Sequence, residues 1–162
     1  MKRFLLIVVG VFMLNSARAE EYFGVRGELL FPFSGGNTSA WALPQFGVQF
    51  GVDFPDASFG FRASASTLIV TYRLALDGYY VLPIQGGSSA YLGAGVGLIG
   101  SFANIAGLQA GQALAEFRGL IGYQSNITGF GGRFFLELLP SFIPALNGGT
   151  FGLTVGLGFN FR

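Results

Sequence analysis

Most of the chain alternates apolar side chains with polar or small ones, with a period of two residues. The clearest case is the last twelve residues, FGLTVGLGFNFR, in which Phe, Leu or Val occupies every odd position from 151 to 161. Successive side chains point to opposite faces of a strand, so this segment predicts a strand with one wholly apolar face. Half of the positions on the other face are glycine. A sheet that faces water seldom shows such a face, which favours contact between the apolar face and lipid.

Seven earlier segments repeat this alternation, and proline- or glycine-rich turns separate several of them. The turn signals are clearest at residues 55–58 and 83–89, whereas residues 67–70, between the third and fourth segments, carry no turn residue. Eight strands of about 10 residues each, plus their connections, would use nearly all of residues 20–162. The pattern therefore predicts one all-β domain, a closed antiparallel up-and-down transmembrane barrel with alternating short and longer connections. The predicted strands cover residues 22–31, 44–54, 59–66, 70–82, 90–100, 115–124, 133–139 and 151–162.

The first nineteen residues have a different organisation. A basic start with Lys2 and Arg3 precedes an apolar run at residues 4–14, and Ala17-Arg18-Ala19 follows. This arrangement is typical of a secretory signal peptide, here residues 1–19, cleaved before Glu20. The apolar run is too short for a spanning helix, which needs about 20 residues. The chain has no cysteine, which excludes a lipid-modified cysteine and disulfide bonds.

Composition and charge narrow the class of protein further. The chain is 51% hydrophobic and 10% charged, yet no apolar stretch after residue 19 approaches the length of a spanning helix. Without the leader, six Arg stand against eight acidic residues, and no Lys remains. The resulting net charge of −2 gives no support for nucleic-acid binding or for a polybasic lipid-binding patch.

The closing segment resembles the last strand of bacterial outer-membrane β-barrel proteins. That strand carries apolar residues at alternate positions and ends on an aromatic residue that the assembly machinery recognises. Phe159 and Phe161 match this assembly signal, and Arg162 follows them. A second stretch, YLGAGVG at residues 91–97, is similar to a mid-chain strand of small barrels in the same OmpA-like superfamily. The resemblance implies export through the inner membrane and a place in the outer membrane. The implied partners are the barrel-assembly machinery and outer-membrane lipid, and we expect a monomer.

The placement of charge predicts which face of the barrel is inside. Ten charged residues lie on the face opposite the phenylalanines, five basic and five acidic. A soluble lipocalin-like barrel that binds a lipophilic ligand has the same period with the faces reversed, but its exterior would then carry few charges among many glycines. A narrow interior needs matched charges because an unpaired buried ion is costly. We therefore predict a structural ion-pair network inside the barrel, made of Arg26, Glu28, Asp53, Arg62, Arg73, Asp77, Glu116, Arg118, Arg133 and Glu137.

Small barrels of this family include lipid-modifying enzymes, so catalysis has to be weighed. The chain has no His and no Cys, which excludes Ser-His and Cys-His nucleophiles and metal sites of the usual His/Cys kind. Arg residues close to Glu116 and Glu137 favour structural ion pairs over catalysis. We predict no enzyme activity and no cofactor.

Three functions stay open at this point. The first is a structural or envelope role with a closed polar interior, and the third is a soluble secreted ligand-binding barrel. The second is a narrow channel or transporter for small hydrophobic solutes. It would require the inward apolar residues to cluster near the loop end of the barrel, namely Ile99, Leu120, Phe135 and Leu139.

Overall fold

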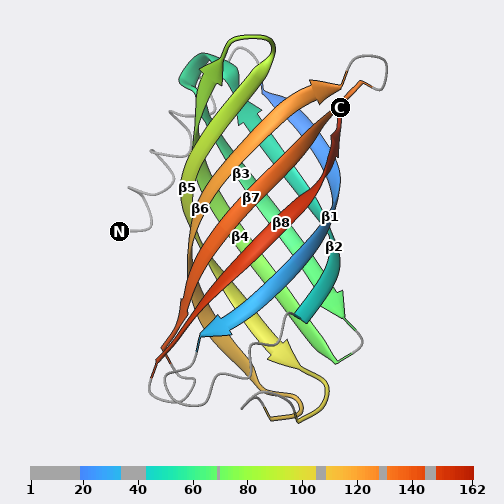
Figure 1. Ribbon diagram of the computed structural model, residues 1–162, viewed down its shortest axis with the longest axis vertical. Coiled ribbons are helices and arrows are strands. Elements are labelled where there is room, and N and C mark those ends of the chain that lie inside the picture. The colour runs from blue at the N-terminus through green and yellow to red at the C-terminus, as the bar shows by residue number, and fades with distance from the viewer. Residues whose placement is uncertain (1–18, 34–42, 69, 105–108, 128–130, 145–148) are drawn as a thin grey trace, which may run out of the picture.

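The protein forms a closed barrel of eight antiparallel strands in which each strand pairs with the next and the last pairs with the first (Figure 1). The computed structural model describes residues 19–33, 43–68, 70–104, 109–127, 131–144 and 149–162. The predicted all-β, up-and-down barrel of eight strands is confirmed. The strands are β1 (Glu20–Phe33), β2 (Leu43–Phe54), β3 (Phe59–Leu68), β4 (Thr71–Ile84), β5 (Ser88–Ser101), β6 (Ala113–Ile127), β7 (Gly132–Ile143) and β8 (Thr150–Phe161).

The two ends of the barrel differ in their connections. The end that holds the start of β1, the end of β8 and the connections at residues 55–58 and 85–87 is called the turn side here, and the opposite end is called the loop side. A short 3-10 helix, η1 (Pro55–Ala57), and Ser58 with a φ of 51° make the first of these turns. Residues 1–18 lie outside the described residues, so the leader stays a prediction.

Several predicted strand boundaries are wrong by a few residues. β3 ends at Leu68 and β4 begins at Thr71, so this loop-side connection is as tight as the turns opposite and breaks the expected alternation of lengths. Strands β6 and β7 continue past Ser125 and Pro140, where connections were predicted, because both residues still lie opposite partners: Ser125 opposite Phe134, and Pro140 opposite Leu153. Turn-forming residue types are therefore compatible with the ends of these long strands.

The strands are strongly staggered around the barrel. Following directly opposed residues from Tyr22 on β1 around the wall leads back to β1 at Pro32, ten positions further along. A stagger of this kind requires strands tilted by about 35–45° to the barrel axis. Residues far apart in sequence are thereby brought to the same height in the lumen. Between Tyr22 and Pro32, the path of opposed residues passes through Gly51, Arg62, Asp77, Gly95, Arg118, Ser141 and Gly152.

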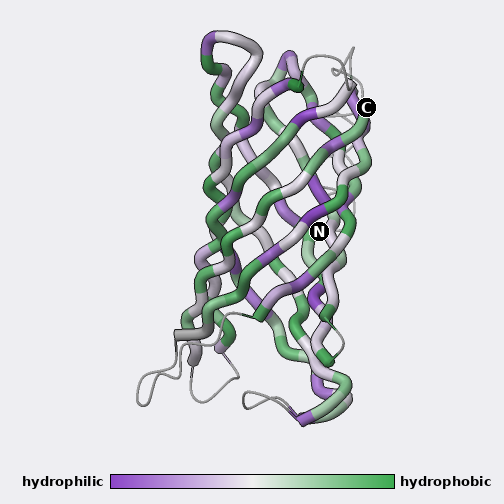
Figure 2. Tube along the Cα trace, turned by 45° about the vertical axis from the view of Figure 1, so that its right-hand side comes forward, coloured by the Kyte–Doolittle hydropathy of each residue, from purple (hydrophilic) through white to green (hydrophobic). Residues whose placement is uncertain are grey.

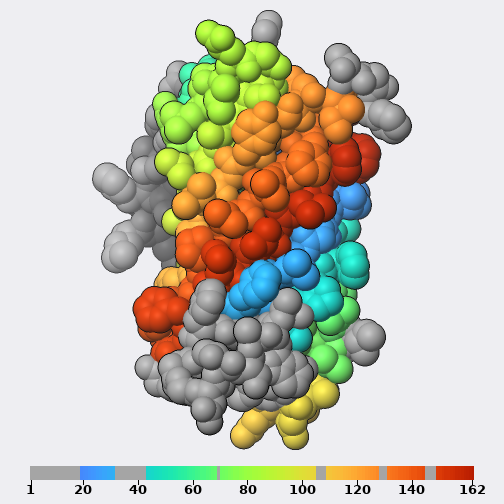
Figure 3. Space-filling model, viewed as in Figure 1, coloured from blue at the N-terminus to red at the C-terminus, as the bar shows by residue number. Residues whose placement is uncertain are grey.

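The outer wall is apolar over most of its area. Among the described residues, twenty-five large apolar side chains are exposed, including Phe46 at 67%, Leu76 at 63% and Phe151 at 65%. Hydrophobic and hydrophilic positions alternate along the strands in Figure 2, and side chains of β6, β7, β8 and β1 cover the face seen in Figure 3. Soluble monomers rarely expose contiguous apolar patches above a few hundred Å². In the described part of the chain, no helix is long and apolar enough to span a membrane.

Glycines on the inner face make room for aromatic rings from the neighbouring strand. Tyr91 lies directly opposite Gly122, and a Cβ added at Gly122 would lie 2.2 Å from the Tyr91 ring. The same arrangement recurs at three other pairs near the turn side, so each ring occupies the space that a side chain at the opposite position would need. These rings, called the aromatic collar here, and their glycines are Tyr22 with Gly51, Tyr79 with Gly60, Tyr91 with Gly122, and Phe135 with Gly158.

Apolar side chains occupy the loop-side end of the lumen. Four buried residues from β1, β5, β6 and β7 pack together there, and Leu43 packs against them. This cluster is called the apolar cap. The lumen is therefore layered, with the cap at the loop side, the aromatic collar towards the turn side, and polar side chains between them. The four buried residues of the cap are Leu30, Ile99, Leu114 and Ile143.

The ring-over-glycine packing predicts a large difference between two glycine substitutions. Gly122→Ala should destabilise the barrel by about 1–3 kcal/mol, because the new methyl group overlaps the Tyr91 ring. Gly27→Ala is the matched control, since the nearest atom to a Cβ there is 4.0 Å away in the Phe46 ring. Urea unfolding in lipid vesicles, followed by circular dichroism, measures both. Equal stability of the two variants would contradict the packing role of Gly122.

Candidate functional site

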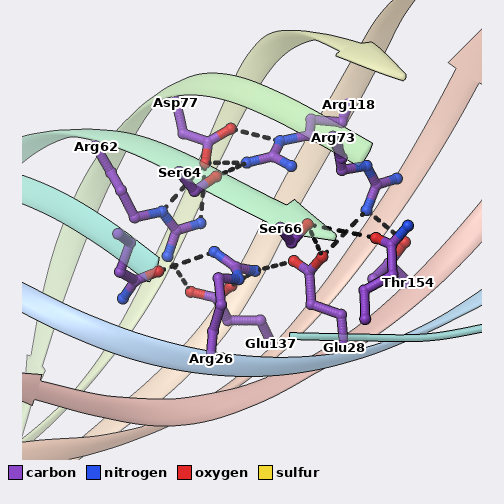
Figure 4. A network of polar contacts seen from close by, with 12 residues as sticks. Arg26, Glu28, Arg62, Ser64, Ser66, Arg73, Asp77, Arg118, Glu137 and Thr154 are labelled. Atoms are coloured by element: carbon purple, nitrogen blue, oxygen red, sulfur yellow. Dashed lines mark hydrogen bonds and ion pairs between the residues drawn. The ribbon is translucent and has the colours of Figure 1, made fainter. Parts of the chain in front are cut away.

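Eight of the ten predicted interior charges form one continuous chain of ion pairs across the lumen (Figure 4). Basic and acidic residues alternate along the chain without a break, four of each. All eight residues are at most 4% exposed. We call this arrangement the ion chain; its order is Arg118, Asp77, Arg62, Glu137, Arg26, Glu28, Arg73 and Glu116.

The first half of the ion chain joins β6, β4, β3 and β7. Arg118 Nε donates to Asp77 Oδ1 at 2.7 Å, and Arg62 Nη2 donates to Asp77 Oδ2 at 2.9 Å. Arg62 also donates to Glu137, which accepts a further hydrogen bond of 2.6 Å from the Tyr91 hydroxyl. Asp77 and Glu137 therefore each join two partners, and the Tyr91 contact links the chain to the aromatic collar.

The second half returns from β7 through β1 to β4 and β6. Arg26 Nη2 lies 3.0 Å from Glu137 Oε2 and 2.5 Å from Glu28 Oε1. Arg73 Nη1 lies 3.7 Å from Glu28 Oε2, and Arg73 Nε donates to Glu116 Oε2 at 2.8 Å. Glu116 is thus the end of the chain and contacts one arginine, whereas Glu137 contacts two.

Neutral polar side chains form hydrogen bonds with donors and acceptors of the charged residues that the ion pairs do not use. Gln49 accepts from Arg26 at 2.8 Å, Thr154 accepts from Arg73 at 3.0 Å, and Ser66 donates to Glu28 at 2.9 Å. Within the described ranges, the buried side-chain polar atoms without a hydrogen-bond partner are Arg26 Nε, Arg118 Nη1 and Ser141 Oγ. The interior is therefore a nearly saturated hydrogen-bond network, which is the condition under which buried charges are tolerated.

Two inward glycines make room for the ions themselves. Strand β5 runs between Asp77 on β4 and Arg118 on β6, and a Cβ added at Gly95 would lie 2.1 Å from Asp77 Oδ1. Only glycine lets the Asp77 carboxylate reach across β5. On β8, a Cβ at Gly156 would lie 3.2 Å from Arg26 Nη2.

The other two predicted residues, Arg133 and Asp53, lie in a separate cluster at the turn-side mouth of the barrel. Arg133 Nη1 lies 3.3 Å from Asp53 Oδ2, and Arg162 Nη2 lies 3.0 Å from the same oxygen. Arg162 also pairs with Glu20. We call these four residues the mouth cluster. The predicted network missed Glu20 and Arg162, although both fit the inward alternation: Glu20 lies one step before the first predicted strand, and Arg162 is the last residue of the predicted closing strand.

The four inward apolar residues on which the transporter hypothesis rested do not form one path. Ile99 lies in the apolar cap, whereas Leu120 and Leu139 pack with Tyr79 and Tyr91, deeper in the lumen. Phe135 is fully buried over Gly158 in the aromatic collar. The required cluster at the loop end is therefore absent among these four residues.

The described residues contain no group of three or more His, Cys, Asp or Glu side chains placed to hold a metal ion. The acidic residues of the lumen instead have arginine partners throughout the ion chain and the mouth cluster. The arrangement of these charges is that of ion pairing.

Comparison with solved structures finds the same fold in small bacterial outer-membrane barrels. Neisserial surface protein A (NspA) superimposes with a TM-score of 0.66 at 14% identity, over 90% of this chain and 99% of that one. The N-terminal β-barrel domain of Pseudomonas aeruginosa OprF gives a TM-score of 0.56 at 18% identity, over 89% and 100%. No protein-family model and no curated protein sequence matches the chain. The predicted resemblance to OmpA-like barrels is confirmed at the level of the fold.

The connectivity of the ion chain predicts unequal effects for two glutamate substitutions. Glu137→Gln should cost about 3–5 kcal/mol, because it leaves both Arg26 and Arg62 short of a buried partner. Glu116→Gln, at the end of the chain, should cost clearly less because only Arg73 loses a carboxylate partner, and Arg73 keeps Glu28 and Thr154. Guanidinium unfolding of the refolded variants gives both values. A loss for Glu116→Gln as large as that for Glu137→Gln would show that the chain does not act as a connected unit.

Proposed function

We propose that this protein is an integral outer-membrane barrel with a closed, ion-paired interior and a structural role in the cell envelope. The observation that carries the proposal is the inside-out distribution of side chains. The eight charges of the ion chain are buried in the lumen, while large apolar side chains cover the outer wall. A soluble barrel with this wall would expose far more apolar surface than soluble monomers normally do, which argues against the ligand-binding alternative. The fold shared with outer-membrane barrels supports the same location.

Three layers of side chains argue for a closed lumen. An eight-stranded barrel is only just wide enough for its own side chains to fill. Here the apolar cap occupies the loop-side end, the ion chain links opposite walls in the middle, and the aromatic collar lies towards the turn side. A hydrophobic solute would have to displace paired charges to pass from cap to collar. This favours the structural role over the narrow transporter.

The closed lumen predicts that the purified protein forms no stable pores. In planar bilayers, we expect no sustained openings of the size that a water-filled porin gives, because the ion chain crosses the lumen between opposite walls. A known porin reconstituted under the same conditions is the positive control. Stable porin-sized openings of the unmodified protein would rule out the closed interior.

The assembly signal also stays a proposal, which a comparison of two phenylalanines on β8 can test. Phe159 and Phe161 both point outward near the turn side, 39% and 45% exposed, and Phe151 points outward near the loop side of the same strand. Phe161→Ala should lower the amount of folded barrel in the outer-membrane fraction several-fold, whereas Phe151→Ala should not. Cell fractionation followed by electrophoresis without heating measures folded protein.

The membrane location has its own test. Recovery of the unmodified protein in a detergent-free periplasmic wash would contradict that location.

A further inference from the structure

The turn-side mouth holds a pocket that the ion chain does not use. It has a volume of about 360 Å³, at the lower end of the range for small-molecule sites, which is about 300–1,000 Å³. The pocket lies on the turn side of the aromatic collar, so a ligand could enter it without passing through the lumen. The mouth cluster forms one side, Asn126, Ser88 and Ser89 extend it, and Val81 contributes an apolar surface.

Both arginines of this pocket pair with Asp53, and Arg162 also pairs with Glu20, but their side chains are more exposed than those of the arginines in the ion chain. Asp53 accepts from three donors at once: Tyr79 Oη on Oδ1 at 2.6 Å, and Arg133 and Arg162 together on Oδ2. Neither arginine forms the two-pronged contact with Asp53 that makes an arginine–carboxylate pair strong. The Arg133 and Arg162 side chains are 23% and 28% exposed, against at most 2% for the arginines of the ion chain. Two guanidinium groups thus share one carboxylate oxygen while remaining within reach of solvent.

Apolar residues also line the pocket. They are Val81, Pro83 and Ile84 from the end of β4, with Phe54, Pro55 and Phe59 next to the first turn. Ile84 is 49% exposed. A ligand in this pocket would therefore meet both arginine donors and apolar side chains.

We propose that the mouth pocket binds a small organic carboxylate that carries an apolar group. The carboxylate binds between Arg133 and Arg162, and the apolar group packs against Val81, Pro83 and Ile84. Planar carboxylates match the fork of a guanidinium group. A doubly charged phosphate is disfavoured because Asp53 and Glu20 lie in the same pocket. The proposal does not rest on the closed lumen, because the pocket opens at the turn side.

The first test compares ligands on the unmodified protein in lipid nanodiscs. N-acetyl-leucine carries both required groups, N-acetyl-leucinamide lacks the carboxylate, and acetate lacks the apolar group. Residues 20–162 contain only six arginines, so their side-chain Nε–Hε signals can be followed individually by nuclear magnetic resonance. We expect saturable shifts of the Arg133 and Arg162 signals with N-acetyl-leucine, and binding at least about tenfold weaker for the amide and for acetate. Equal binding of acid and amide, tighter binding of inorganic phosphate, or no saturable shift with the acid overturns the proposal.

Variants test the same assignment independently. Arg133→Gln should weaken binding of N-acetyl-leucine at least about tenfold, as the loss of a charge-assisted hydrogen bond predicts. The affinity of Arg133→Lys should lie between that of the unmodified protein and that of Arg133→Gln. The fold should survive, since Asp53 keeps Arg162 and Tyr79. Glu21→Gln is the control, because Glu21 is exposed at the turn-side end of β1 but does not line the pocket. Unchanged affinity in Arg133→Gln, or an equal loss in the control, would remove Arg133 from the site.

Discussion

A charge buried inside a narrow barrel needs a partner of opposite sign within reach, and this requirement connects the whole interior. Glu137 on β7 meets Arg26 on β1 and Arg62 on β3, so its partners come from strands that are not its neighbours in the sheet. Only the ten-residue stagger brings these side chains to one height. Because a slip of one residue turns every side chain of a strand to the other face, it would also place an arginine in lipid, at a cost of about 2–4 kcal/mol at the midplane. Register and closure are therefore specified together, which supports a structural role for the ion chain.

The same interior depends on glycine for space. Gly95 and Gly122 lie in strands and are not among the described glycines with positive φ, which are Gly86, Gly87, Gly111, Gly131 and Gly149. Their importance is therefore steric, because any Cβ would overlap the Asp77 carboxylate or the Tyr91 ring. A large inward side chain on one strand is matched by a bare position on the next, and the lumen fills without overlap. This pairing accounts for the glycine-rich inner face that made the closing segment unusual for a water-facing sheet.

The alternation of side chains was enough to predict the number of strands and the face on which Arg26 or Asp77 lies, because both follow from a period of two. The pairing of charges was not predictable in this way. Arg26 and Glu137 are 111 residues apart, and their contact depends on the stagger of the closed barrel, which the alternation does not encode. The connection between Leu68 and Thr71 was expected, but its exact boundaries could not be predicted, since residues 67–70 include no turn-forming residue and Ile69 and Val70 are β-branched residues typical of strands. Of the mouth cluster, Asp53 and Arg133 were predicted. Glu20 was not, because it precedes the first apolar residue of the predicted strand.

The ion chain and the mouth cluster use the same residue types in two different surroundings. Between the apolar cap and the aromatic collar, the arginines are at most 2% exposed, and attraction between charges is strong where water is excluded. At the mouth, the side chains of Arg133 and Arg162 are 23% and 28% exposed, so solvent screens their ion pairs with Asp53 more than it screens those of the ion chain. Exchanging one carboxylate partner for another therefore costs little for an arginine at the mouth, whereas the same exchange in the ion chain would cost a great deal. The Tyr79 hydroxyl, which binds Asp53 from the collar, holds that carboxylate in place while its arginine partners stay available to a ligand.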